Sequence, residues 1–133
     1  MKLNFLLVLR IIAAAILLQT LYFKFTAAPE SQFIFQSLGV EPWGRILTGL
    51  LELVACIFLF IPSMQIFGAI LAASIMLGAV AGHLFVLGIV VQDDGGLLFL
   101  LACIVLAFNL MILFMQKTKV MELFFKMKKS CCQ

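Results

Sequence analysis

The sequence predicts an all-α membrane protein, an antiparallel bundle of four transmembrane helices with a short interfacial helix between the first and second spans. Two observations predict this fold class. Hydrophobic residues make up 65% of the 133 residues and charged residues only 11%, whereas soluble domains have about 45–50% and about 25%. The apolar residues are also gathered into four long runs. A soluble chain of this size has too small an interior to bury so much apolar surface, so lipid must cover it.

Each run approaches the roughly 20 apolar residues that a transmembrane helix needs. The expected spans are residues 3–23, 45–61, 66–91 and 97–115. Pro42 suits the first turn of the second span, and Pro62 closes that span. Asp93 and Asp94 can cap the amino end of the fourth span. The connections between the last three spans are short, which predicts antiparallel neighbours, so residues 1–116 are expected to form one bundle.

The longest segment between spans, residues 24–44, has an apolar pattern of its own. Apolar and polar residues are mixed over residues 29–38, and Gly39 follows as a helix stop. Tyr22 and Trp43 flank this stretch, and their amphipathic rings favour the headgroup level of a bilayer. We therefore expect a short helix that lies in the membrane interface and does not cross it.

The basic residues predict the orientation. Five of the nine Lys and Arg residues follow position 116, and with four spans these share one side of the membrane with Lys2. An excess of Lys and Arg marks the cytoplasmic side, so both termini are expected in the cytoplasm and the chain in the inner membrane. Residues 117–133 form a basic amphipathic cytoplasmic tail, which suits the lipid bilayer as a partner. The sequence has no aromatic-basic motif typical of nucleic-acid binding, and no nucleic-acid partner is expected.

Polar residues within or beside the spans are the candidates for a ligand-binding site or internal network, because a charge near mid-bilayer costs about 2.5–3.5 kcal/mol and needs a partner or a purpose. They are Arg10, Gln19, Lys24, Arg45, Glu52, His83 and Asn109. Counting along the spans places Glu52 and His83 in the outer half, so we expect them near each other, with Lys24 or Arg45 toward the outside. Arg10 and Asn109 fall nearer the cytoplasm.

Two interpretations of these residues remain open. A buried Arg, Glu and His can form an ion network that fixes helix register and performs no chemistry. They can also form a site for a proton-linked or redox-active ligand such as a quinone, because histidine titrates near neutral pH and a desolvated glutamate can become neutral. No catalytic residue is assigned. A single histidine without paired acidic ligands predicts no metal site.

The third span contains small residues at a regular spacing. Ser74, Gly78 and Gly82 recur every four residues in the third span, which predicts close packing within the bundle, with homodimer formation as the alternative.

The four cysteines contain no C-x-x-C pair, and Cys131 and Cys132 are expected to be a reduced cytosolic pair.

Four segments and two single positions carry a resemblance to a known family. The segments are LQTLYFKF at 18–25, GVEPWGR at 39–45, GLLEL at 49–53 and QDDGG at 92–96. Together with Arg10 and His83, they resemble the DoxX-like family of four-helix membrane proteins over about residues 5–116. The resemblance implies that Arg10, Glu52-Leu53 and His83 stand at family positions, and it implies the same four-helix fold.

The resemblance also implies a function class. The family takes its name from a membrane subunit associated with a thiosulfate:quinone oxidoreductase, and some relatives belong to membrane redox complexes that handle thiol stress. We therefore expect a redox-associated accessory subunit or a bundle that binds a quinone-type ligand, with a membrane redox complex or a second copy as partner. The alternative is a non-catalytic scaffold or assembly factor, and a third hypothesis is a small transporter acting as an oligomer. The chain has no cofactor motif, so it is not expected to be an enzyme on its own.

Overall fold

The computed structural model describes residues 2–131, and these residues fold into helices without a β-strand. The elements are α1 (Lys2–Phe25), α2 (Pro29–Ser37), α3 (Trp43–Phe60), α4 (Gln65–Gly82), the π-helical segment η1 (His83–Leu87), α5 (Leu97–Met115) and α6 (Lys117–Cys131). Four stretches are long and apolar enough to cross a membrane, namely Asn4–Phe25, Trp43–Phe60, Gln65–Leu87 and Leu97–Met115. The chain is thus a multi-pass membrane protein, and the all-α four-helix fold class is confirmed.

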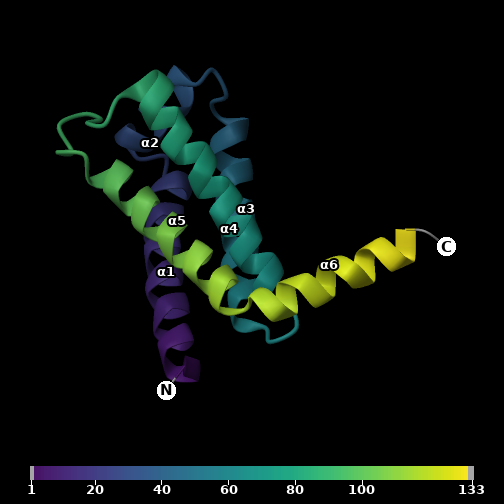
Figure 1. Ribbon diagram of the computed structural model, residues 1–133. Helices are drawn as coiled ribbons and strands as arrows, with labels where there is room; N and C mark the ends of the chain where they lie inside the picture. The colour runs from purple at the N-terminus through teal and green to yellow at the C-terminus, as the bar shows by residue number, and fades with distance from the viewer. Residues whose placement is uncertain (1, 132–133) are drawn as a thin grey trace.

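The four long helices form a closed ring of neighbours. α1 packs against α3 and α5, and α4 packs against the same two helices. Successive crossings alternate in direction, so each neighbouring pair is antiparallel (Figure 1). The short helix α2 lies at one end of the bundle beside η1, and we call this the α2 end. At the opposite α6 end, helix α6 contacts α5 near the junction of the two helices and projects away from the bundle (Figure 1).

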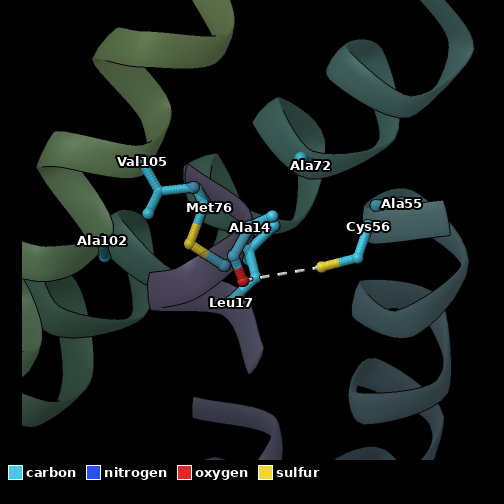
Figure 2. Packing of buried hydrophobic residues seen from close by; sticks show 8 residues of the cluster. All are labelled: Ala14, Leu17, Ala55, Cys56, Ala72, Met76, Ala102 and Val105. Carbon is cyan, nitrogen blue, oxygen red and sulfur yellow. Dashed lines mark hydrogen bonds between the residues drawn. The ribbon is translucent and has the colours of Figure 1, made fainter. Parts of the chain in front are cut away.

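The core consists of small side chains supplied equally by the four helices. Each helix contributes two residues to the main buried cluster, which Figure 2 shows: Ala14, Leu17, Ala55, Cys56, Ala72, Met76, Ala102 and Val105. The thiol of Cys56 lies 3.9 Å from the carbonyl oxygen of Ala14, joining α3 to α1 (Figure 2). Alanines let helix backbones approach closely, which is how helices pack where lipid removes the hydrophobic driving force.

The backbones of α4 and α3 approach closely at Gly68, a glycine that the sequence pattern did not single out. A Cβ atom on Gly68 would lie 2.7 Å from the backbone nitrogen of Leu59. By contrast, Ser74 and Gly78 are exposed, and Gly78 has no atom within 4 Å of a Cβ position. The expectation of packing within the bundle is therefore wrong for Ser74 and Gly78, whereas Gly82 is half-buried and a Cβ atom on it would lie 3.8 Å from the Leu38 side chain. The face of α4 that packs against the bundle carries Gly68 and Ala72. Ser74 lies two residues beyond Ala72, about 200° around the helix axis, and so points away from the bundle.

Local signals explain where most helices begin and end. Pro42 lies at the N-cap position immediately before α3, one residue outside the helix, and not within the first turn as expected. α3 ends at Phe60, two residues before Pro62, in accord with its role as a stop. The helical part of the third span ends at Leu87 and not at residue 91. Gly88 ends it with a φ of 81°, and its N–H donates to the carbonyl of His83 at 2.8 Å.

The remaining elements match the expected local patterns. α2 forms where the interfacial helix was expected, with Phe35 buried and Phe33 exposed. α6 is a continuous helix of 15 residues, none of them buried. Cys131 is exposed at its end, and Cys132 lies outside the described residues.

Candidate functional site

A buried ion pair joins α1 to α3 near the α2 end of the bundle. The Nζ atom of Lys24 lies 2.6 Å from Oε1 of Glu52. The hydroxyl of Thr20 lies 3.3 Å from Oε2 of Glu52 and 2.9 Å from the carbonyl oxygen of Leu17, so its single hydrogen is shared between these two acceptors. Thr20 and Lys24 are four residues apart and share one face of α1, so both reach the same carboxylate. The Glu52 side chain is 1% exposed and that of Lys24 14%, so both carboxylate oxygens are satisfied by the protein itself.

A second ion pair continues the network toward the α2 end. The guanidinium of Arg45 donates from Nε to both carboxylate oxygens of Glu41, at 2.8 and 3.0 Å. Its Nη1 also donates to the main-chain carbonyl of Lys24. Arg45 is 6% exposed and thereby ties the start of α3 to the preceding loop and to the last turn of α1. Glu41, Arg45, Lys24 and Glu52 therefore form one connected polar layer.

His83 does not join this layer. Its Nδ1 atom lies 2.9 Å from the carbonyl oxygen of Gly88, and its ring meets Phe99 edge-on at a centroid distance of 5.7 Å. Among residues 2–131 no hydrogen bond or ion pair links His83 to Glu52, so the two side chains are not directly bonded to each other. Each of the two groups has another partner. The long side chain of Lys24 reaches the carboxylate of Glu52, and the π-helical turn brings a main-chain carbonyl to the imidazole of His83.

The hydrogen bond to Gly88 fixes the tautomer of His83. A carbonyl oxygen can only accept, so Nδ1 carries the hydrogen in the neutral ring and Nε2 has a free lone pair. Within the described part of the chain, Nε2 has no hydrogen-bond partner, although the whole residue is only 4% exposed. His83 thus has one unused acceptor, and because Nε2 is not among the fully buried unpartnered polar atoms of the described residues, this atom reaches the surface of the bundle.

The loop after η1 is held by Asp94. Its carboxylate accepts hydrogen bonds from the backbone N–H groups of Val91 and Gly96, both at 2.9 Å, and of Leu98 at 3.0 Å. Burial alone would raise the pKa of the Asp94 carboxyl, but these three bonds, together with the nearby His83, outweigh it and lower that pKa. The prediction that an aspartate caps the start of α5 is confirmed for Asp94.

Thr20, and not the expected Gln19, reaches the internal polar layer from α1. Gln19 is exposed on α1 and takes no part in the network, so its assignment to the internal site is wrong. One residue along a helix turns the side chain by about 100°, which carries Gln19 away from Glu52 and brings Thr20 toward it. The four-residue spacing between Thr20 and Lys24 was the signal that could have identified the threonine.

Arg10 and Asn109 lie toward the α6 end and bond to backbone. Arg10 donates from Nε to the carbonyl of Leu6 at 3.2 Å and from Nη1 to the carbonyl of Leu59 at 3.3 Å. Asn109 donates from Nδ2 to the carbonyl of Val105 at 2.8 Å, while its buried Oδ1 has no partner among the described residues. The seven candidates therefore divide between the layer at the α2 end, the isolated His83, the exposed Gln19 and these two.

Comparison with known proteins adds no assignment. No family model, curated protein or solved structure matches this chain. The chemistry of the site must be argued from its geometry.

That geometry favours structural over reactive roles for the polar layer. Within residues 2–131, no group of three or more His, Cys, Asp and Glu residues is arranged to hold a metal ion. Glu52 is shielded and already accepts from an ammonium and a hydroxyl. Removing one partner of such a pair destabilises a protein far more than the intact pair stabilises it relative to two apolar side chains. The main effect of the pair is therefore to fix which faces of α1 and α3 meet.

Proposed function

We propose that this chain is a DoxX-like accessory protein of the inner membrane that assembles with a membrane redox complex and catalyses no reaction with its own residues. The observation that carries the proposal is the internal pairing of Lys24 with Glu52 and of Arg45 with Glu41. Ionisable residues inside a membrane are functional candidates by default, whereas a buried ion pair that the protein satisfies internally can serve to fix helix packing. These charges are satisfied, which directs the functional role to the surfaces of the bundle and of α6.

The surface of α6 supports this division of roles. None of its residues is buried, and Met121, Phe124, Phe125 and Met127 are each at least half exposed, at 50–65%. Its lysines give it a basic character, and the positive-inside rule favours a cytoplasmic position for it and for both termini. An amphipathic basic helix of this kind is attracted to an anionic leaflet, where it can lie beside the membrane-facing parts of a larger complex. The resemblance around Lys24 and Glu52 supports a redox complex as that partner.

A second candidate function, binding of a quinone-type ligand, is favoured by His83 alone. The neutral ring presents Nε2 as an acceptor, which suits the hydroxyl of a quinol. His83 also opens a π-helical segment, and such segments occur frequently at functional sites.

Purification of the full-length protein in mild detergent, followed by mass spectrometry of co-purifying proteins and quinones, separates the two. The accessory proposal predicts that oxidoreductase subunits co-purify with the protein. It also predicts that deletion of residues 117–133 removes them while the bundle stays abundant. The absence of any oxidoreductase above the level found with an unrelated four-span protein would refute it.

The ligand candidate predicts a different pattern. His83→Ala should remove a co-purifying quinone at unchanged protein abundance, whereas Leu84→Ala, which alters an exposed neighbour on the same segment, should retain it. Equal quinone content in wild type and His83→Ala would exclude His83 as a ligand-binding residue. Loss of abundance in Glu52→Gln without any selective loss of quinone would fit the structural role of the polar layer.

A further inference from the structure

A cavity opens at the α6 end of the bundle, outside the polar layer. Its volume is about 480 Å³, and it is bounded by α1, the α3–α4 turn and the junction of α5 with α6. Sites for small molecules have volumes of about 300–1,000 Å³. The polar residues that line it are Arg10, Gln65, Gln116, Thr118 and Lys119. Two of these are cations and none is acidic, so the lining selects for a negatively charged group.

Arg10 is the buried charge of this cavity. It is 6% exposed and lines the cavity wall. Its two hydrogen bonds use Nε and Nη1 and go to neutral carbonyls, and no carboxylate pairs with it among residues 2–131. The Nη2 group has no protein partner in the same part of the chain. A buried guanidinium without a counter-ion is costly, and an anion entering from the cavity would remove that cost.

The start of α6 supplies the opposite wall. Thr118 and Lys119 belong to the first turn of this helix and line the cavity. The first turn of a helix has backbone N–H groups without intrahelical partners and is the positive end of its dipole, which favours an anion. Gln116, at the helix junction, donates from Nε2 to Oε1 of Gln65 at 3.3 Å, so the amides that line the cavity are held in place.

From these contacts we propose that the cavity binds the phosphate group of an anionic membrane phospholipid, with Arg10 and Lys119 as its two positive charges. Phosphate is the oxyanion that guanidinium and ammonium groups bind together with helix N-termini. A lipid is favoured over free phosphate because Leu6, Pro62 and Met115 give the cavity an apolar side. The cavity also lies where the spanning helices end, at the depth of lipid headgroups.

Occupation of the cavity would have a structural consequence. α6 contacts α5 near their junction, whereas Arg10 belongs to α1. A phosphate held between Arg10 and Lys119 would connect α6 to the bundle and fix the direction in which it leaves. This inference is independent of the proposed accessory function, because it concerns lipid and not a protein partner.

The test uses the full-length protein in a non-ionic detergent. Binding of phosphatidylglycerol and of phosphatidylcholine is measured by native mass spectrometry and by the shift of the thermal unfolding midpoint, and sodium phosphate forms a third arm. We expect saturable binding of phosphatidylglycerol that phosphatidylcholine does not reproduce. Equal binding of both lipids would overturn the proposal. Binding of sodium phosphate as tight as that of the lipid would overturn the lipid assignment in favour of a free anion.

Two variants and one control place the binding at this cavity. Lys119→Gln should weaken phosphatidylglycerol binding about five-fold, and Arg10→Gln about ten-fold or more, because the arginine is the more desolvated cation. Lys128→Gln removes an exposed charge from the same helix away from the cavity and should leave the affinity unchanged. If Arg10→Gln does not fold, the test depends on comparing the phosphatidylglycerol affinity of Lys119→Gln with that of Lys128→Gln. Equal affinity in Lys119→Gln and Lys128→Gln would refute the site.

Discussion

Replacing Lys24 with methionine removes the cation from the buried pair while keeping an apolar side chain of similar length. Glu52, 1% exposed, then retains only the hydroxyl of Thr20 at 3.3 Å. Removing one partner of a buried ion pair costs about 3–5 kcal/mol. We place Lys24→Met in the upper part of this range, because the stranded carboxylate cannot reach water. Glu52→Leu should cost less, because the ammonium of Lys24 is 14% exposed and its long stem can extend to the interface.

The double variant Lys24→Met with Glu52→Leu completes the cycle. An apolar pair of similar volume leaves no buried charge, so the double variant should regain at least about 2 kcal/mol relative to Lys24→Met alone. The assay is reversible unfolding in mixed micelles with increasing dodecyl sulfate, followed by far-ultraviolet circular dichroism. Lys126→Met, on the exposed surface of α6, serves as control and should change stability by less than about 0.5 kcal/mol. A loss of less than about 1 kcal/mol in the free energy of unfolding for Lys24→Met would show that Glu52 is not stranded in an apolar environment. A double variant no more stable than Lys24→Met would show the same.

Three further predictions use the same assay. Gly68→Ala should destabilise the protein by about 1–3 kcal/mol, because its Cβ would meet the backbone of α3, whereas Gly78→Ala, with open space, should be neutral or stabilising; equal effects would contradict the packing. Asn109→Leu should stabilise by roughly 1 kcal/mol, because it removes the orphaned Oδ1, and a loss of stability would show that this oxygen has a partner. Asp94→Ala should destabilise by about 1 kcal/mol at neutral pH. Because folding lowers the pKa of Asp94, its contribution is present above the unfolded-state value and is lost as the pH falls through the lowered one, so the deficit should shrink below about pH 4; a deficit independent of pH would contradict the capping role.

The fold was predictable because its signals are local or depend on composition alone. Long apolar runs define the spans in any four-span protein, and Pro62 and Asp94 act on the residues next to them. The end of η1 was missed because hydropathy continues through Ile89–Val91 after the backbone has left the helix at Gly88. A window of apolar residues reports solvent preference and not backbone conformation.

The candidate site was only partly predictable, because pairing depends on helix rotation and side-chain reach. Depth alone placed Glu52 with His83, yet the flexible stem of Lys24 reaches the carboxylate first. Adjacent residues of a helix point about 100° apart, so Thr20 and not Gln19 faces Glu52. The cavity beside Arg10 could not be seen from sequence at all, since its walls come from three separate parts of the chain, including the junction with α6.

If lipid surrounds four crossings, the two ends of the bundle lie on opposite sides of the membrane. Labelling by a membrane-impermeant maleimide tests it directly in a background in which the native cysteines are replaced. Ser63→Cys probes the α3–α4 turn, and Asp93→Cys probes the loop before α5; both positions are exposed. With both termini in the cytoplasm, we expect intact cells to label position 93 and only inverted vesicles to label position 63. Labelling of both positions from the same side would contradict it.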